Sequence, residues 1–257
     1  MKTVLLLTAL TMLAALAPDS SSGIEFKEIL DKTVEREFQN DSAVRDAVYT
    51  ADGLYTELND EGKRVKEVRT KRTVYRKGSD KSYSEYSYIY VDGKKLTGEE
   101  MKKETAKMRG GDKDKNKDKK SLMSPFNPAA IGNYNFSYAG SADWNGQPSW
   151  MIDFRPKVPD ETLGKGRAWI SRSDYNIFCL EFGISKMPWM LKNFNMKIVY
   201  ADYGGYWLPG ELEMKMRVKI KLLLTFADKH LTFKDIYTGY KPNGGIRDSF
   251  FKDKVLD

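Results

Sequence analysis

The segment ELEMKMRVKIKLLLTF, residues 211–226, alternates apolar and polar side chains along its whole length. A period of two places successive side chains on opposite faces of an extended chain. One face carries the charged residues Glu211, Glu213, Lys215, Arg217, Lys219 and Lys221, and the other is apolar. The apolar face consists of Leu212, Met214, Met216, Val218, Ile220, Leu222, Leu224 and Phe226. Fully extended, the segment would be about 50 Å long, which exceeds an ordinary strand, so we expect a bend or bulge within it.

Similar alternation recurs from residue 46 to residue 240 and predicts about ten strands. The expected strands are 46–58, 64–76, 82–91, 134–142, 149–155, 166–172, 176–184, 195–201, 206–226 and 231–240. Turn-forming residues separate several of them and predict hairpins at 59–62, 77–80 and 144–147. The sequence therefore predicts an antiparallel meander.

Two segments show helical rather than strand character. Residues 24–40 carry apolar side chains at nearly helical spacing among glutamates and lysines, which predicts an amphipathic helix. Thr97, with Glu100 three residues later, matches a capping box and opens a second helix that we expect to end near Arg109. Helices between groups of hairpins indicate the α+β class, with helices covering one twisted sheet.

The charged stretch GGDKDKNKDKK follows the second predicted helix and lacks apolar side chains. We expect a flexible loop near residues 110–121, because such a segment cannot bury enough apolar surface to order itself. It is either a solvated loop or a contact with anionic lipid or a partner.

Residues 1–22 have the character of a secretory signal peptide. A single lysine precedes an uncharged apolar run, and Ala15 to Ala17 form a small-x-small cleavage pattern. Cleavage near residues 20–22 is the alternative. A membrane anchor is less favoured, since the run is shorter than the roughly 20 residues that a spanning helix needs. We expect a single mature domain over residues 23–257, located outside the cytoplasm.

Charge and cysteine content narrow the class of protein further. The formal net charge is +7, from 43 lysines and arginines against 36 acidic residues, and cleavage after Ala17, which removes Lys2 but keeps Asp19, would leave +6. This favours anionic surfaces such as lipid head groups over nucleic acid, for which no binding module is recognisable. Cys179 is the single cysteine, so no intramolecular disulfide can form and the core must supply the stability.

The sequence offers little for catalysis. A nucleophilic triad moves its proton through a histidine, and the single histidine, His230, falls in a predicted turn at 227–230. Asp153, Asp174 and Glu181 are carboxylates on or near strands, with no spacing that pairs them. We therefore expect no enzymatic activity, no metal site and no cofactor, and a carboxylate-dependent hydrolase is the least favoured class.

Binding is the better interpretation of the apolar faces. Several predicted strands carry one, and these faces must be closed by a second sheet, by helices, by lipid or by a ligand. A membrane-spanning barrel would need such a face on every strand, whereas residues 64–76 carry charges on both faces. The connector GISKMPWMLKNF, residues 183–194, is rich in methionine and is either an adaptable lid or a short helix plugged into the core.

Two motifs, GRAWISRSDYNIFCLEF and YADYGGYWLPGELEM, resemble the outer-membrane lipoprotein-sorting family of LolA/LolB-like carriers. Gly166, Trp169 and Ile170 match that family's G-x-x-W-I-D strand, while Ser171 stands where an acidic residue is common. Residues 204–209, GGYWLP, look like its G-x-W-x-P strand entry. The resemblance implies an incomplete β-barrel, made by a strongly curved antiparallel sheet, whose concave face is lidded by helices and holds acyl chains.

This resemblance predicts a periplasmic carrier that binds lipoprotein acyl chains or phospholipid and moves them toward the outer membrane. Inner- and outer-membrane transport proteins would be its partners, with transient contact to the membrane surface. The expected lipid-binding residues are Met214, Met216, Val218, Ile220, Leu222, Met196 and Ile198, with Trp189 and Met190 at the lid. If the strand packs on a helix instead, these residues are core. An envelope sensor on the same fold, which recognises lipoproteins or a protein partner, is the alternative function.

Overall fold

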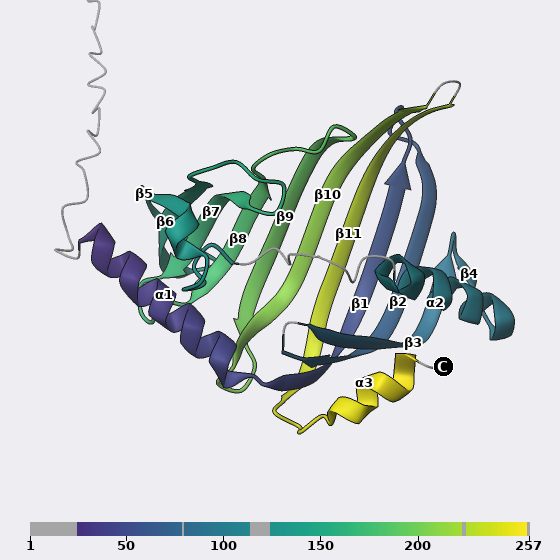
Figure 1. Cartoon of the computed structure of the whole chain (residues 1–257), viewed down its shortest axis with the longest axis horizontal. Helices are drawn as coiled ribbons and strands as arrows, with labels where there is room; N and C mark the ends of the chain where they lie inside the picture. Colours follow the sequence, from purple (N-terminus) through teal and green to yellow (C-terminus); the bar gives the residue numbers. More distant parts are fainter. Residues whose placement is uncertain (1–24, 79, 114–123, 223–224, 256–257) are drawn as a thin grey trace, which may run out of the picture.

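The structure, a computed structural model, describes residues 25–78, 80–113, 124–222 and 225–255. The predicted signal peptide and most of the predicted charged loop therefore lie outside the described residues. The described strands form a single 11-stranded antiparallel sheet in the order β4-β3-β2-β1-β11-β10-β9-β8-β7-β6-β5. Its edge strands β4 and β5 do not pair with each other, so the curved sheet stays open (Figure 1). The predicted α+β class, with a curved and incompletely closed antiparallel sheet, is confirmed.

Most strands have a buried or partly buried face, in keeping with the period-two pattern, whereas both residues of β4 are exposed and β8 is buried on both faces. The strands are β1 Asp46–Leu58, β2 Arg64–Lys77, β3 Lys81–Val91, β4 Lys94–Lys95, β5 Tyr134–Trp144, β6 Gln147–Pro156, β7 Gly164–Ser171, β8 Ile177–Ile184, β9 Leu191–Asp202, β10 Trp207–Leu222 and β11 Thr225–Pro242. They form two meanders, β1 to β4 and β5 to β11. The pairing of β1 with β11 joins these meanders and brings Ala47 opposite Pro242.

Three α-helices and one short 3-10 helix accompany the sheet in the described part of the chain. They are α1 Phe26–Ala43, α2 Gly98–Lys113, η1 Ile131–Asn133 and α3 Asp248–Val255. Helices α1 and α2 lie toward opposite ends of one face of the sheet (Figure 1). Helix α3 packs on the other face, where the ring of Phe250 lies 4.7 Å from that of Tyr75.

Strand register defines the face under α1 and α2, because residues directly opposite each other in antiparallel pairs share a face. We call it the inner face, and the opposite face the outer face. One inner row crosses the sheet through Ile152, Ala168, Leu180, Ile198, Leu212, Asp235, Gly53, Thr70 and Ile89. The next runs through Phe136, Phe154, Gly166, Phe182, Met196, Met214, Phe233, Tyr55, Val68 and Val91. Both rows are mostly apolar.

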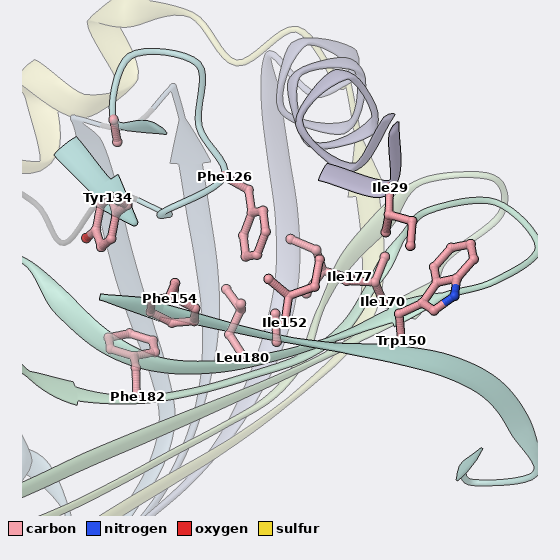
Figure 2. Close-up of a cluster of buried hydrophobic side chains, with 12 residues drawn as sticks. Ile29, Phe126, Tyr134, Trp150, Ile152, Phe154, Ile170, Ile177, Leu180 and Phe182 are labelled. Carbon is pink, nitrogen blue, oxygen red and sulfur yellow. The ribbon is translucent and has the colours of Figure 1, made fainter. Parts of the chain in front are cut away.

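The main hydrophobic core fills only one end of the inner face. Figure 2 shows Ile29 of α1 and Phe126, from the segment before β5, beside the side chains that rise from the strands. Ile152, Ile170 and Leu180 are each at most 2% exposed at its centre. The core therefore lies over β5 to β8, and α1 covers it.

Three sequence predictions are wrong in their boundaries. The expected strand 206–226 covers β10 and the start of β11, because β10 ends at Leu222 and β11 begins at Thr225. The expected turn at 227–230, with His230, lies within β11. Helix α2 continues to Lys113, so residues 110–113 of the predicted loop are helical.

Candidate functional site

The stretch of the inner face between α1 and α2 is apolar but only partly buried. Met214 lies opposite Met196 of β9 on one side and opposite Phe233 of β11 on the other. Leu212 lies opposite Ile198 in the neighbouring row. All five side chains are partly exposed, in contrast to the fully buried core under α1. This stretch thus has apolar area that the protein's own described side chains do not close off.

The structure brings most of the predicted lipid-binding residues onto this one face. Met214, Met216 and Val218 follow one another at alternate positions of β10 and are partly buried. Met196 and Ile198 occupy the adjacent positions of β9 and pack against the edge of the core. These five form a continuous apolar strip.

The other four predicted residues lie toward the ends of these strands. Ile220 and Leu222 lie at the C-terminal end of β10, where their backbones pair with those of Ala227 and Thr225 in β11. Trp189 and Met190 lie in the connector between β8 and β9, and they are 66% and 41% exposed. The structure therefore does not place Trp189 or Met190 in the core.

A cavity of about 400 Å³ adjoins the strip on its α2 side. Its apolar lining includes Leu54, Tyr55, Val68, Phe233 and Met108, the last from α2. Tyr55 and Phe233 continue the row of Met196 and Met214, and their rings lie 4.8 Å apart. Strip and cavity together form one apolar surface, which we call the inner-face site.

Sequence reasoning missed the cavity half of this site. The alternation in β1 and β11 predicts that Tyr55 and Phe233 face a core. Periodicity carries no information on which strands pair, however, so the contact between these two residues could not be predicted.

A charged pair interrupts the apolar lining of the cavity. Arg72 of β2 donates to Asp235 of β11 through Nη1 and Nη2, at 3.2 and 2.6 Å. The two side chains are only 18% and 21% exposed. Burial lowers the pKa of Arg72, but hydrogen bonds to Asp235 and its charge outweigh burial and raise the pKa above its usual value. The guanidinium therefore stays charged beside the apolar strip.

Gly53 of β1 makes room for this pair. A Cβ at Gly53 would lie 2.6 Å from Thr70 Oγ1 and 2.8 Å from both Arg72 Nη1 and Asp235 Oδ1. The Tyr237 hydroxyl also donates to Asp235, at 3.2 Å. The carboxylate is thus held from two sides, and a larger residue at position 53 would displace it.

Polar residues lie where the cavity meets solvent. The Tyr55 hydroxyl donates to Glu57 at 2.8 Å, and Lys229 Nζ lies 2.7 Å from the same carboxylate. The hydrogen bond from Lys229 is the main cause of the lowered pKa of Glu57. Burial, aided by Glu57, raises the pKa of Tyr55. The inner-face site is therefore apolar inside and charged at this rim.

The carboxylates considered for catalysis lie on the outer face or in a turn. Asp153 and Glu181 flank Arg167 across β6, β7 and β8, at a shallow cavity of about 800 Å³. Arg167 Nε donates to Asp153 at 2.6 Å, and Asn195 donates to Glu181 at 3.2 Å. Asp174 accepts from the Asn176 side chain in the turn before β8. Each of these carboxylates is engaged in a structural contact.

The remaining reactive side chains are dispersed as well. His230 lies opposite Arg217 in β10 and Leu58 in β1. Cys179 is fully buried, and burial raises its pKa to about 12, so the thiol is inert at neutral pH. Within the described residues, no cluster of three or more His, Cys, Asp or Glu side chains could hold a metal ion. The helices of the same described part are all too short or too polar to span a membrane.

The two sequence motifs have identifiable structural roles. At Gly166 a Cβ would overlap the carbonyl oxygen of Glu181 on β8, so only glycine allows β7 and β8 this close approach. Gly204 and Gly205 have φ angles of +69° and +89°, which suit the turn before β10. Trp207 donates through Nε1 to the carbonyl oxygen of Ile177, at 2.8 Å.

A family model described as "Family of unknown function (DUF5686)" matches residues 71–230. None of the curated proteins matches the chain. Among solved structures, the chain is similar to an outer membrane lipoprotein-sorting protein domain from Vibrio parahaemolyticus, with 13% identity, coverage of 88% of this chain and 99% of that one, and a TM-score of 0.42. A DUF1329 family protein from Desulfovibrio piger is similar as well, with 12% identity, coverage of 90% of this chain and 98% of that one, and a TM-score of 0.43. A third similar structure is a LolA superfamily protein from Nitrosomonas europaea, with 10% identity, coverage of 91% of this chain and 100% of that one, and a TM-score of 0.37. Two of these three carry the lipoprotein-sorting or LolA description that the sequence motifs resemble.

Proposed function

The chain belongs to DUF5686, a family of unknown function, and from the geometry of the inner-face site we propose that it is a periplasmic carrier of acyl chains. Its cargo is a lipoprotein or another lipid, which it binds at the inner-face site and moves toward the outer membrane. The protein acts by binding and release, without a catalytic step.

The observation that supports this proposal is the incomplete burial of the apolar strip. Met214, Met196 and Met216 are partly exposed on the face that elsewhere forms the core. A concave apolar strip beside a cavity of about 400 Å³ gives a hydrocarbon tail a surface on which to leave water. A core packed to completion would leave the tail no such surface.

The energetics of acyl-chain burial are sufficient for binding. Each buried methylene contributes about 0.8 kcal/mol, so a 16-carbon chain gains up to about 13 kcal/mol before ordering costs are subtracted. A carrier must also release its cargo. Methionine side chains in the strip adapt to different chain shapes without tight complementarity, which favours binding that is reversible.

We propose that the acyl chain lies along Met214, Met216, Val218, Ile220 and Leu222 of β10, beside Met196 and Ile198 of β9. Trp189 and Met190 stand at the rim where the chain enters. The polar head group of the cargo would then lie near the charged rim at Glu57 and Lys229. Inner- and outer-membrane transport proteins would load and unload the carrier.

Mass spectrometry of lipids that co-purify with the exported protein tests this function. A defined acylated species, present in stoichiometric amounts, supports the carrier. A protein that purifies empty and does not bind fluorescent fatty acids contradicts it. If that empty protein formed a tight, selective complex with a lipoprotein or a signalling protein, the sensor function would replace the carrier.

A further inference from the structure

The connector between β8 and β9 contains a hydrogen-bonded turn with unusual central residues. The Leu191 amide donates to the Pro188 carbonyl oxygen at 2.9 Å, which places Trp189 and Met190 at the two central positions. Turns of soluble proteins favour Gly, Asn, Asp and Ser there. Here the two side chains are large and apolar, and they are 66% and 41% exposed.

Hydrogen bonds on both sides hold this connector in place. Ser185 donates through its amide to Leu163 O and through Oγ to Asp160 O, both at 2.8 Å, which ties the connector to the β6–β7 loop. The Lys219 amide of β10 donates to Met190 O, also at 2.8 Å. The exposure of Trp189 is therefore a property of an anchored turn.

Further exposed apolar side chains lie close by in the chain and on the linked loop. Met187 precedes the turn and is 38% exposed, and Val158 of the β6–β7 loop is 74% exposed. Of the nine exposed large apolar residues in the described part of the chain, four lie on these two linked loops. Such clustering marks an interaction surface, whereas apolar residues scattered singly need no explanation.

Charge and residue type favour a lipid surface as the partner. Residues 185–192 contain Lys186 and Lys192 and no carboxylate, and Lys192 Nζ donates to Trp189 O at 2.9 Å. On the β6–β7 loop, Asp160 and Glu161 outweigh Lys157 by one charge, so the two linked loops together keep a net charge of +1. Tryptophan is enriched at membrane interfaces, where its ring is buried and its N–H stays solvated, and lysines beside it attract anionic head groups.

We propose that the 188–191 turn inserts Trp189 and Met190 into the surface of a bilayer that contains anionic phospholipid. This contact positions the start of β9 and the end of β10 at the membrane. It does not depend on the identity of the cargo, nor on whether the inner-face site binds a lipid at all.

Co-sedimentation of the mature protein with phosphatidylglycerol/phosphatidylcholine vesicles tests the proposal. The wild-type protein is expected to bind these vesicles at low salt, and to bind pure phosphatidylcholine vesicles at least fivefold less. The double variant Trp189→Ser, Met190→Ser is expected to lose at least tenfold in apparent affinity. Lys186→Gln, which removes one positive charge beside the turn, is expected to weaken only the binding to anionic vesicles.

The variant Phe38→Ser is the matched control. Phe38 is 57% exposed on α1 and lies outside the turn, so this variant should bind vesicles like the wild type. Thermal unfolding of the double variant checks that it folds, as expected when exposed side chains are replaced.

Three results would overturn the proposal. Absence of wild-type binding to anionic vesicles at low salt is the first. Unchanged binding by the double variant is the second. The third is a wild-type dimer that the double variant dissociates, since the turn would then face a second copy of the chain. Vesicle binding by a protein that purifies empty and does not bind fluorescent fatty acids would support this contact and contradict only the carrier function.

Discussion

The Arg72 guanidinium reaches across strand β1 and donates two hydrogen bonds to the Asp235 carboxylate, in the space that a side chain at position 53 would occupy. Residues 53, 70 and 235 interrupt an otherwise apolar row of the inner face. Because the pair is largely buried, it fixes β2, β1 and β11 relative to one another and sets the polar limit of the cavity.

Replacement of Gly53 by alanine is expected to destabilise the protein. The added Cβ would lie within 2.8 Å of three polar atoms, so the pair must shift, at a cost of about 1–3 kcal/mol. Urea denaturation measures the change. Gly132→Ala is the control, because no atom lies within 4 Å of its added Cβ. Equal free energies of unfolding of the two variants would show that Arg72 and Asp235 can shift without loss of stability.

Loss of one member of the Arg72–Asp235 pair is expected to cost more than loss of both. Arg72→Leu leaves a largely buried carboxylate without its main donor, at a cost of about 2 kcal/mol. The double variant Arg72→Leu, Asp235→Leu removes the unpaired charge and should be more stable than either single variant. A double-mutant cycle, built from free energies of unfolding in urea, gives the coupling free energy between Arg72 and Asp235. Additive losses would show that the pair does not act as a unit.

Asp228 is expected to make the stability of the protein sensitive to acid. Hydrogen bonds from Arg217 at 2.8 Å, together with Lys219, hold the pKa of this buried carboxyl well below its usual value of 3.8. A lowered pKa in the folded state means that the contribution to stability is complete above the unfolded pKa. It is lost as the pH falls from about 5 toward the folded pKa.

Urea denaturation midpoints at pH 7 and at successive pH values below 5 measure this dependence. Asp228→Asn should lower the free energy of unfolding at pH 7 and should make it depend less steeply on pH below pH 5. A variant whose dependence is as steep as that of the wild type would assign the acid sensitivity to other carboxyls.

Most strands could be predicted from the sequence because their apolar and polar side chains alternate. The hairpin at Asn145 and Gly146 was predictable as well, since both residues adopt positive φ, +51° and +83°, as the Asn-Gly turn requires. The end of β10 was not predictable, because KLLLTF, residues 221–226, contains no turn-forming residue. Helix α3 escaped prediction too: its eight residues are too few to establish a period.

The site was predictable only in part for a related reason. Alternation placed Met196, Met214 and Met216 on apolar faces, and the register puts these faces together. The ion pair of Arg72 and Asp235 spans 163 residues of sequence with another strand between its members. No local pattern encodes such a pairing, because it depends on β1 closing against β11.

A charge introduced into the apolar strip is expected to weaken lipid binding. Met214→Glu places a carboxylate where the acyl chain would lie, and burial of that charge is unfavourable, so affinity for a fluorescent fatty acid should fall at least tenfold. Lys215→Glu introduces the same residue on the outer face of the same strand and should bind like the wild type. Equal affinity of the two variants would move the lipid away from the inner face.

Methyl NMR of protein labelled with [13C-methyl]methionine tests the central claim most directly, because methionines lie on both faces of the sheet. On titration with oleate, the account predicts that the signals of Met196, Met214 and Met216 shift or broaden to saturation. The signal of Met151, on the outer face of β6, should stay in place. Saturating oleate that leaves the three inner-face signals unchanged would contradict acyl-chain binding at this site.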